Sequence, residues 1–109
     1  MTGRFTNQGE LSTSGTIIHT APENNVSEIR LLRFNNPTAY RLIVSKYTSS
    51  TATTTQVYQI DLSDGDTITD SFQYFLNEGD YIIASSSITG TTFIAEGEDM
   101  PNINVVRCR

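Results

Sequence analysis

The chain has 109 residues, a formal net charge of -5 and a sequence pI of about 4.6, with one cysteine and one histidine. This length accommodates one domain with one core, and the single cysteine excludes an internal disulfide or a cysteine-based zinc site. No apolar run approaches the roughly 18–20 residues that a membrane-spanning helix needs, and the acidic balance disfavours a nucleic-acid groove, which needs a basic footprint. We therefore expect no membrane partner and no nucleic-acid partner.

The composition is that of a β protein. Threonine and serine, at 16 and 11 residues, make up about a quarter of the chain, and threonine suits the pleated surface of a strand better than a helix. No apolar i, i+3, i+4, i+7 pattern persists for three turns, whereas short β-branched runs alternate with Gly, Pro, Asn and Asp. The predicted fold class is all-β: a single antiparallel β-sandwich, jelly-roll-like, of seven or eight strands.

The chain divides into three predicted parts. Residues 1–14 are polar and are predicted to form an N-terminal arm rather than a core strand, with Phe5 as the apolar anchor. Such an arm buries too little surface to offset a backbone entropy of roughly 1–2 kcal/mol per residue, so we expect it to become ordered only in an assembly. Residues 15–101 form the predicted β-sandwich domain. Residues 102–109 (NINVVRCR) form a C-terminal tail whose weak alternation suits strand addition at a sheet edge.

The predicted strands follow one another closely along the sandwich domain. Two of them, over 26–35 and 40–48, are joined at Asn36-Pro37-Thr38 and are predicted to pair as the central hairpin. The polar run 49–55 (SSTATTT) is interpreted either as a mobile loop or as the exposed ends of two strands. The other strands are predicted over 15–20, 56–62 and 91–95, together with one in each copy of an internal repeat.

That repeat, L-x-[DE]-G-D-x-I, occurs at 62–68 and again at 76–82. In each copy the glycine supplies the positive φ of a turn, the leucine before it enters the core, and the isoleucine after it begins a strand. Two copies are too few for a solenoid. We therefore interpret the repeat as recurrent turn chemistry at one end of the sandwich.

Alternation along the strands predicts which side chains form the core. Val57, Tyr58 and Tyr81 are borderline, because bulky residues next to one another occupy both faces of a strand, and a partner would then have to cover some outward apolar surface. The residues predicted to face inward are Ile17, Ile29, Leu42, Val44, Ile60, Ile68, Ile82 and Phe93.

The second half of the chain is rich in carboxylates. From Asp61 to Asp99 there are nine acidic residues and no basic one. A calcium site is the functional interpretation, but the spacing does not match an EF-hand loop, and solvated turn carboxylates are the favoured interpretation. A glycosidase would need two carboxyls beside a cleft with aromatic platforms, and the chain has no tryptophan.

Few residues offer nucleophilic or redox chemistry. His19 lies in the middle of a predicted strand, and no serine occupies a G-x-S-x-G elbow, so this histidine is predicted to be structural. Cys108 has neither a second cysteine nor a neighbouring histidine, which disfavours a reactive thiol. We predict a protein that is not an enzyme and that uses no cofactor and no metal.

The basic residues are six arginines and one lysine, and arginine is enriched where proteins meet. Strict alternation over 29–34 would bury either Arg30 or Arg33 without a partner, which is costly, so a β-bulge at Leu31-Leu32 is predicted to turn both outward. They would then share an outer face with the strand 40–48, in one arginine-rich patch. A solvated sheet face is the alternative. The predicted interface residues are Phe5, Arg30, Arg33, Arg41, Ile43, Tyr47 and Val105.

The order of several motifs resembles a pattern in small β-sandwich virion proteins of tailed bacteriophages. It is carried by residues 19–30 (HTAPENNVSEIR), 34–36 (FNN) and 40–44 (YRLIV), and the two repeat turns resemble later hairpins of that family. His19 stands where the family has a tyrosine, and the arm and the tail lie outside the pattern. The resemblance implies a non-enzymatic virion structural protein: a capsid decoration or auxiliary protein, a head fibre, or a neck or tail component.

The resemblance also implies partners. These are copies of the chain itself, in a homo-oligomer, and other virion proteins, namely the major capsid, portal or neck, or tail proteins. The first 15 residues lack the apolar core of a secretory signal, so we expect the chain to be made in the host bacterial cytoplasm and to reside in the virion. The alternative function is a carbohydrate- or receptor-binding module, because the same sandwich serves both.

Overall fold

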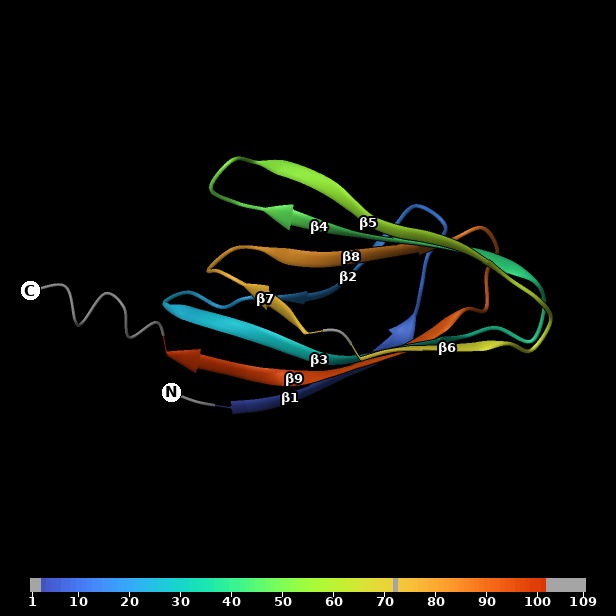
Figure 1. The fold of residues 1–109 in the computed structure, drawn as a ribbon, viewed down its shortest axis with the longest axis horizontal. Helices are drawn as coiled ribbons and strands as arrows, with labels where there is room; N and C mark the ends of the chain where they lie inside the picture. The colour runs from blue at the N-terminus through green and yellow to red at the C-terminus, as the bar shows by residue number, and fades with distance from the viewer. Residues whose placement is uncertain (1–2, 72, 102–109) are drawn as a thin grey trace, which may run out of the picture.

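The chain folds into two antiparallel β-sheets packed face to face, which confirms the predicted all-β sandwich (Figure 1). This computed structural model describes residues 3–71 and 73–101. Its described residues contain nine strands, against the seven or eight predicted, because a strand forms within the predicted arm and a short one precedes the second repeat turn. The strands are β1 Gly3–Glu10, β2 Thr16–Thr20, β3 Asn25–Asn35, β4 Tyr40–Thr48, β5 Thr53–Leu62, β6 Thr67–Asp70, β7 Tyr74–Leu76, β8 Tyr81–Ser86 and β9 Thr92–Pro101.

The strands are divided between the sheets in an order that differs from their order in the chain. Sheet A has the order β1-β9-β3-β6, with β7 also paired to β3, and sheet B has the order β2-β8-β4-β5. Among the nine described strands, only β4 and β5 are consecutive strands that pair with each other, and their hairpin is the uppermost pair in Figure 1. The predicted hairpin between 26–35 and 40–48 is therefore wrong, since β3 and β4 belong to different sheets.

A buried asparagine explains why the chain crosses between the sheets after β3. Asn36 is almost fully buried, and its amide donates to Thr91 Oγ1 at 2.8 Å and to the Thr89 carbonyl at 3.0 Å. Its side-chain oxygen accepts bonds from the backbone N–H of Thr38 at 2.9 Å and from the hydroxyl of Thr38 at 3.0 Å. These bonds hold a corner rather than a tight hairpin turn, and they direct β4 into sheet B.

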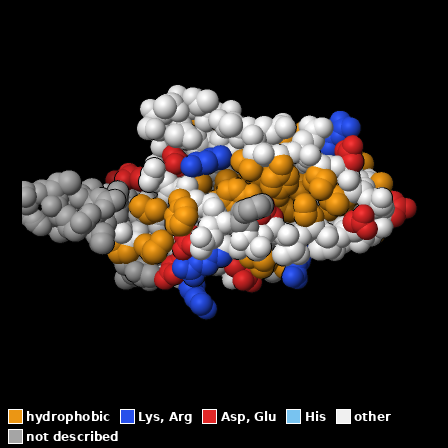
Figure 2. All heavy atoms as spheres, viewed as in Figure 1, with side chains coloured by type: hydrophobic (Ala, Val, Ile, Leu, Met, Phe, Trp, Pro, Cys, Tyr) orange, Lys and Arg blue, Asp and Glu red, His pale blue; other side chains and the backbone are white. Residues whose placement is uncertain are grey.

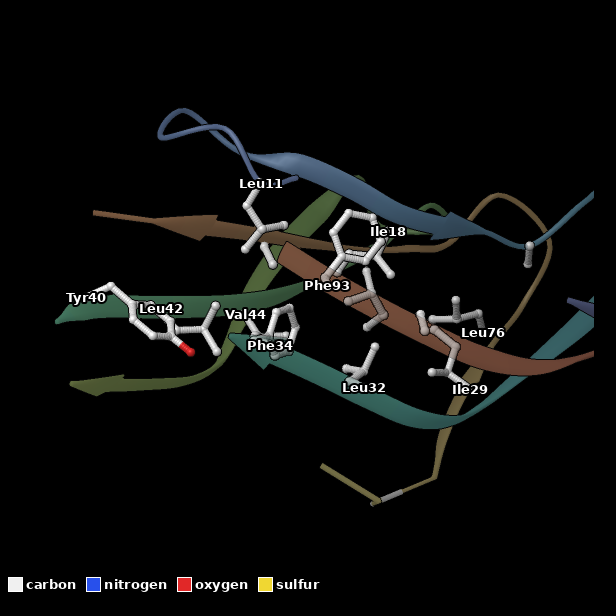
Figure 3. Close-up of a cluster of buried hydrophobic side chains, with 14 residues drawn as sticks. Leu11, Ile18, Ile29, Leu32, Phe34, Tyr40, Leu42, Val44, Leu76 and Phe93 are labelled. Carbon is white, nitrogen blue, oxygen red and sulfur yellow. The ribbon is translucent and has the colours of Figure 1, made fainter. Parts of the chain in front are cut away.

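Most of the predicted core residues face inward (Figure 3). Ile29, Leu42, Val44, Ile82 and Phe93 are buried, and Ile60 and Ile68 are partly buried against the core. The exception is Ile17, which is 49% exposed, and Ile18 is buried in its place. A register shift in the pairing of β2 with β8 lies between Ile17 and His19, so the alternation changes parity at that point.

A second register shift, in β3, allows both Arg30 and Arg33 to face outward. The bulge predicted at Leu31-Leu32 is present one residue earlier, between Ile29 and Leu31, where Arg30 is the extra residue opposite β9. Arg30 and Arg33 are both exposed, while Ile29 and Phe34 are fully buried. The outward direction of both arginines, and the bulge as its cause, are therefore confirmed with the position corrected.

The N-terminal segment is part of the sandwich rather than a free arm. Strand β1 pairs with β9 along its whole length, from Gly3 opposite Asp99 to Glu10 opposite Thr92, and Leu11 is buried in the core. The expectation that this region forms no strand is wrong. The polar composition of residues 3–10 gives no sign of a strand, because the strand is held by backbone pairing with β9. Strand β9 is itself longer than predicted, since it runs to Pro101 rather than to residue 95.

The two repeat turns have the predicted chemistry. Gly65 and Gly79 both adopt positive φ, at 76° and 84°, and in each turn the following aspartate bonds the backbone N–H three residues back, Asp66 to Ser63 and Asp80 to Asn77. The prediction that both turns lie at one end of the sandwich is wrong. The first contacts the end of β3 at Asn36 and the second contacts the loop before β3 at Ala21.

Candidate functional site

The predicted arginine-rich patch is divided between the two outer faces of the sandwich. Arg30 and Arg33 lie on the outer face of sheet A, whereas Arg41, Ile43 and Tyr47 belong to sheet B. The single patch is therefore wrong, because its two halves point in opposite directions. Whether either face contacts a partner stays a prediction.

On the outer face of sheet A, Arg30 is bound by carboxylates of its own chain. Its guanidinium donates to Glu28 Oε1 at 2.8 Å and to Glu98 Oε1 at 2.9 Å. The hydrogen bond to Glu28 is the main cause that raises the pKa of Arg30. Gln73 donates to the other oxygen of Glu28 at 2.7 Å. Arg30 thus neutralises its own neighbours, while Arg33 makes one long bond, at 3.4 Å, to Thr69 Oγ1.

The outer face of sheet B is more apolar. Tyr47 and Tyr81 stack on it with ring centroids 4.6 Å apart, and Ile17 and Val57 are its most exposed aliphatic side chains. Arg41 donates to Asp61 Oδ1 at 2.8 Å, and this bond raises the pKa of the arginine and lowers that of Asp61. The predicted aromatic and aliphatic anchors are present on this face, without the arginines of sheet A.

Two other predicted interface residues lie elsewhere. Phe5 does not point outward from an arm but stacks on His19 of the same chain, with ring centroids 3.7 Å apart and planes within 4°. Its predicted contact with a neighbouring subunit stays a prediction. Val105 lies outside the described residues.

His19 is the centre of a polar cluster between the two sheets. Its Nδ1 faces the amide nitrogen of Asn7 at 3.0 Å, and its Nε2 lies 2.9 Å from Asp99 Oδ1 and 3.1 Å from Ser27 Oγ. The same amide of Asn7 donates to the Ile18 carbonyl at 2.9 Å, and a carbonyl can only accept. The nitrogen of this amide therefore faces the ring, so Nδ1 accepts and Nε2 carries the proton.

This cluster contains serine, histidine and aspartate but does not form a nucleophilic triad. A triad needs the carboxylate on one ring nitrogen and the serine on the other, which must accept the serine proton. Here both Ser27 and Asp99 face Nε2, and the Ser27 hydroxyl donates to the Asp99 carboxylate. Ser27 is also fully buried. The cluster fastens β1 and β2 to β3 and β9, in keeping with the structural role predicted for His19.

The carboxylates of the second half serve several turns. Asp64 Oδ1 accepts a bond from the Ala39 N–H at 2.6 Å, and Asp80 accepts bonds from the N–H groups of Ser49 and Asn77 at 2.8 and 3.0 Å. Over residues 3–71 and 73–101, no group of three or more His, Cys, Asp or Glu side chains is placed to hold a metal ion. The turn interpretation of these carboxylates thus has direct support from their hydrogen bonds.

An apolar groove, which sequence reasoning missed, lies on the side of the sandwich where β5 and β6 are the edge strands. We call it the open-side groove. Figure 2, which views this side, shows hydrophobic side chains gathered between the two layers. Its volume is about 720 Å³, within the range of small-ligand sites. The described residues that line it are Tyr58, Gln59, Ile60, Ile68, Thr69, Asp70 and Ser71.

Tyr58 and the buried Asp70 line the open-side groove, and two further tyrosines lie close to it. The Tyr74 hydroxyl donates to Asp70 Oδ2, and Asp70 is buried. Burial, with Asp70 nearby, raises the pKa of Tyr58 and of Tyr74. Behind them, the buried hydroxyl of Tyr40 has no hydrogen-bond partner among the described residues, and burial raises its pKa too.

One signal in the sequence could have indicated this groove. Ile60 and Ile68 were both predicted to face inward, and the short turn at 63–66 joins their strands. Because that turn crosses from sheet B to sheet A, the two strands cannot pair with each other. Their inward side chains therefore line an opening between two edges.

Among the described residues, no helix is long and apolar enough to cross a membrane. No protein-family model matches the sequence, and a search of curated proteins found no match. Solved structures do match the fold.

A structure described as "Bacillus endospore appendages form a novel family of disulfide-linked pili" has a TM-score of 0.60 at 11% identity and covers 93% of this chain and 87% of that chain. The Drosophila NLP core, described with pentamer formation and histone binding, has a TM-score of 0.50 at 7% identity, covering 87% and 97%. A pentameric capsid protein from metagenomic phage sequences has a TM-score of 0.43 at 14% identity, covering 88% and 61%. At these identities the first two likenesses show the fold alone.

Proposed function

We propose that this chain is a non-enzymatic structural subunit that associates with copies of itself. In its finer form, the proposal is a virion protein of a tailed bacteriophage: a capsid decoration or auxiliary protein, or a neck or tail component. Its partners would be further copies and other virion proteins, and its location would be the virion.

The observation that carries the proposal is the open side of the sandwich. Two edge strands, β5 and β6, lie there with no described strand on their outer sides, and the apolar groove lies between them. Unpaired edges are templates for pairing with another chain, and isolated proteins usually protect them. An apolar surface between two such edges is what a subunit presents to its neighbour.

The lack of a convergent reactive set supports the same proposal. In the described residues, one cluster combines a serine, a histidine and an aspartate. There the Ser27 hydroxyl donates to Asp99 and His19 Nδ1 accepts from Asn7, so no ring nitrogen is placed to take the serine proton. The pilus protein with a similar fold assembles into disulfide-linked pili, which shows that such a sandwich can serve as a repeating unit. The motif order that resembles phage virion proteins supports the finer form.

One observation favours a second candidate, a carbohydrate-binding module. The open-side groove combines the Tyr58 ring with a buried aspartate, Asp70, and small-molecule sites combine apolar and aromatic walls with a few placed polar groups. A glycan array, run with and without calcium, tests this candidate. Saturable binding that Tyr58→Ala abolishes would favour it over the structural proposal.

Self-association is tested by sedimentation velocity and electron microscopy of the purified full chain over a wide concentration range. We expect a defined oligomer or an ordered array. A monomer at every concentration would contradict the proposal. The finer form is tested on particles of a phage that encodes the chain, where immunogold labelling should mark the capsid, neck or tail; unlabelled particles would contradict it.

A further inference from the structure

The open-side groove has the features of an acceptor for one more strand. Edge strand β6 pairs with β3 on one side and with no described strand on the other. In an antiparallel ladder, alternate residues direct their N–H and C=O groups to each side, so half of the residues of β6 direct these groups away from β3. Above that edge, Ile60 and Ile68 are only partly buried. A strand added here would pair with the backbone of β6 and cover the apolar side chains.

The chain itself contains a segment of matching length and pattern. The tail, residues 102–109, reads NINVVRCR, with apolar side chains at Ile103, Val105 and Val106 and arginines at positions 107 and 109. Four residues of strand, 103–106, equal the length of β6, which runs over Thr67–Asp70. We propose that residues 103–106 of one copy add to the outer edge of β6 of a second copy, so that the tail occupies the neighbour's open-side groove. This inference rests on the proposed self-association and specifies its contact.

The alternation of β6 defines the register. Ile68 and Asp70 face inward, whereas Thr67 and Thr69 face outward and are exposed. Residues directly opposite each other in an antiparallel pair project to the same face. Placing Val105 opposite Ile68 therefore directs both Val105 and Ile103 into the groove, and it directs Asn104 to solvent opposite Thr69. In this register Val106 faces outward opposite Thr67, whereas a slip of one residue would expose Ile103 and Val105 and direct Asn104 and Val106 inward.

The same register brings opposite charges together. Beyond the end of β6, it brings Arg107 and Arg109 next to the exposed turn at 63–66, which carries Asp64 and Asp66. The described residues contain five basic and twelve acidic residues, whereas the tail has two arginines and no acidic residue. An acidic body and a basic tail attract each other between copies, and such attraction selects the pairing direction and speeds encounter.

The tail cannot reach this position on its own molecule. Asp70 lies opposite Leu32 of β3, whereas Pro101, the last described residue, lies opposite Asn25 of the same strand. The seven residues from Asn25 to Leu32 correspond to about 20 Å of strand. The two residues from Pro101 to Ile103 can span at most about 7 Å. The acceptor must therefore be a second copy, which makes the contact head-to-tail and able to propagate.

A crosslinking experiment on the full chain tests both the contact and its register. In a Cys108→Ser background, a chain with Thr69→Cys is mixed with a tagged chain with Asn104→Cys, so that only contacts between copies are trapped. Under mild oxidation we expect the mixed disulfide dimer to exceed both like-with-like dimers several-fold. The matched control replaces Asn104→Cys with Val105→Cys, whose side chain would lie on the opposite face from residue 69.

The outcomes separate this inference from the proposed function. A statistical mixture of dimers, or an equal yield from the control pair, would overturn the tail contact. If the full chain still sediments as an oligomer in that case, self-association stands and only the tail contact fails. A chain that is monomeric and gives no mixed dimer overturns both.

A second measurement avoids cysteine altogether. Val105→Asp places a charge in the groove and should weaken self-association about tenfold or more, the effect of losing roughly 1.4 kcal/mol. Asn104→Asp adds the same charge on the solvent side and should change it little. Equal effects from the two substitutions would also overturn the register.

Discussion

The two long sides of the sandwich are built differently. On one side, edge strands β1 and β2 belong to different sheets but are fastened together through Asn7, which bonds both the Ile18 carbonyl and His19. The Phe5 ring stacks on His19 to fill the space between the sheets. On the other side, β5 and β6 flank the open-side groove, where apolar and tyrosine side chains are only partly buried.

This difference assigns the two sides different roles: the β1–β2 side stabilises the fold, and the β5–β6 side is available for association. A closed side satisfies its own polar groups and excludes water, so its contribution to folding is complete within one chain. An open side leaves strand edges and apolar area that a partner can cover. We therefore expect substitutions on the β1–β2 side to change the free energy of unfolding, and substitutions on the β5–β6 side to change association more than folding.

The largest effect is expected at Gly97, where β9 passes between β1 and β3. A Cβ at this position would lie 2.0 Å from the Glu28 carbonyl oxygen and 2.7 Å from the Phe5 ring. Backbone and an enclosed ring can move little, so Gly97→Ala should lower the free energy of unfolding by about 3 kcal/mol, at the upper end for overpacking. Urea denaturation followed by circular dichroism measures this change.

Gly3→Ala is the matched control in the same part of sheet A, since a Cβ there meets nothing within 4 Å. It should leave the urea midpoint unchanged. If Gly97→Ala were equally silent, the β1–β2 side would be loosely packed, and the contrast between the two sides would be wrong.

The second effect compares one buried polar group from each side. His19→Phe keeps a ring against Phe5 but removes the partner of Asn7 and Asp99, so these groups lose hydrogen bonds while partly buried. We expect a loss of about 2 kcal/mol in the free energy of unfolding. Thermal and urea unfolding of the variant provide the measurement.

Tyr40→Phe is the counterpart behind the open-side groove. The Tyr40 hydroxyl is buried without a hydrogen-bond partner among the described residues, and its removal relieves a desolvation penalty. The variant should be as stable as the parent chain, or more stable by up to about 1 kcal/mol. A loss of unfolding free energy as large as that of His19→Phe would mean that the Tyr40 hydroxyl is hydrogen-bonded, and that buried polar groups are equally well satisfied on the two sides.

The strands could be predicted from the sequence because their signals are local. The strand predicted at 40–48 has the bounds of β4, and that at 26–35 differs from β3 by one residue, because alternation between turn residues determines both. Pairing could not be predicted in the same way. Asn36-Pro37 is equally typical of a hairpin and of a corner, and only the buried bonds from Asn36 to Thr91 and Thr89 decide between them.

The sites could be predicted less well, for the same reason. The sequence indicates Phe5 as an apolar anchor but does not reveal that its ring stacks on His19 of the same chain. The outward direction of Arg30 follows from the cost of burying a charge, whereas its pairing with Glu98 depends on β9 lying beside β3. The open-side groove exists because β5 and β6 are edge strands. Whether a strand lies at an edge is decided by the order of strands in its sheet, and the sequence of the strand does not reveal it.

The smallest effect is absent at neutral pH and appears only in alkali. Burial and the neighbouring Asp70 raise the pKa of Tyr58 and Tyr74 in the folded protein, whereas an unfolded tyrosine titrates near about 10. Above that pH the folded state binds more protons than the unfolded state, so the free energy of unfolding must fall as pH rises. Below about pH 10 both states are protonated, and the tyrosines add no pH dependence.

The measurement is the urea midpoint at a series of pH values through the alkaline range, and it separates the two sides of the sandwich. Tyr58→Phe removes one of the groups whose pKa is raised, so its midpoint should fall less steeply than that of the parent chain. His19→Phe, on the β1–β2 side, should lower the midpoint at every pH and leave the alkaline slope unchanged, because no tyrosine is lost. Since Tyr58 and Tyr74 are partly exposed, water screens part of their interaction with Asp70, and the slope should be shallow. An alkaline slope that Tyr58→Phe does not reduce would mean that the tyrosines of the open-side groove are solvated like surface residues, and that the groove is not the apolar surface on which the proposed association depends.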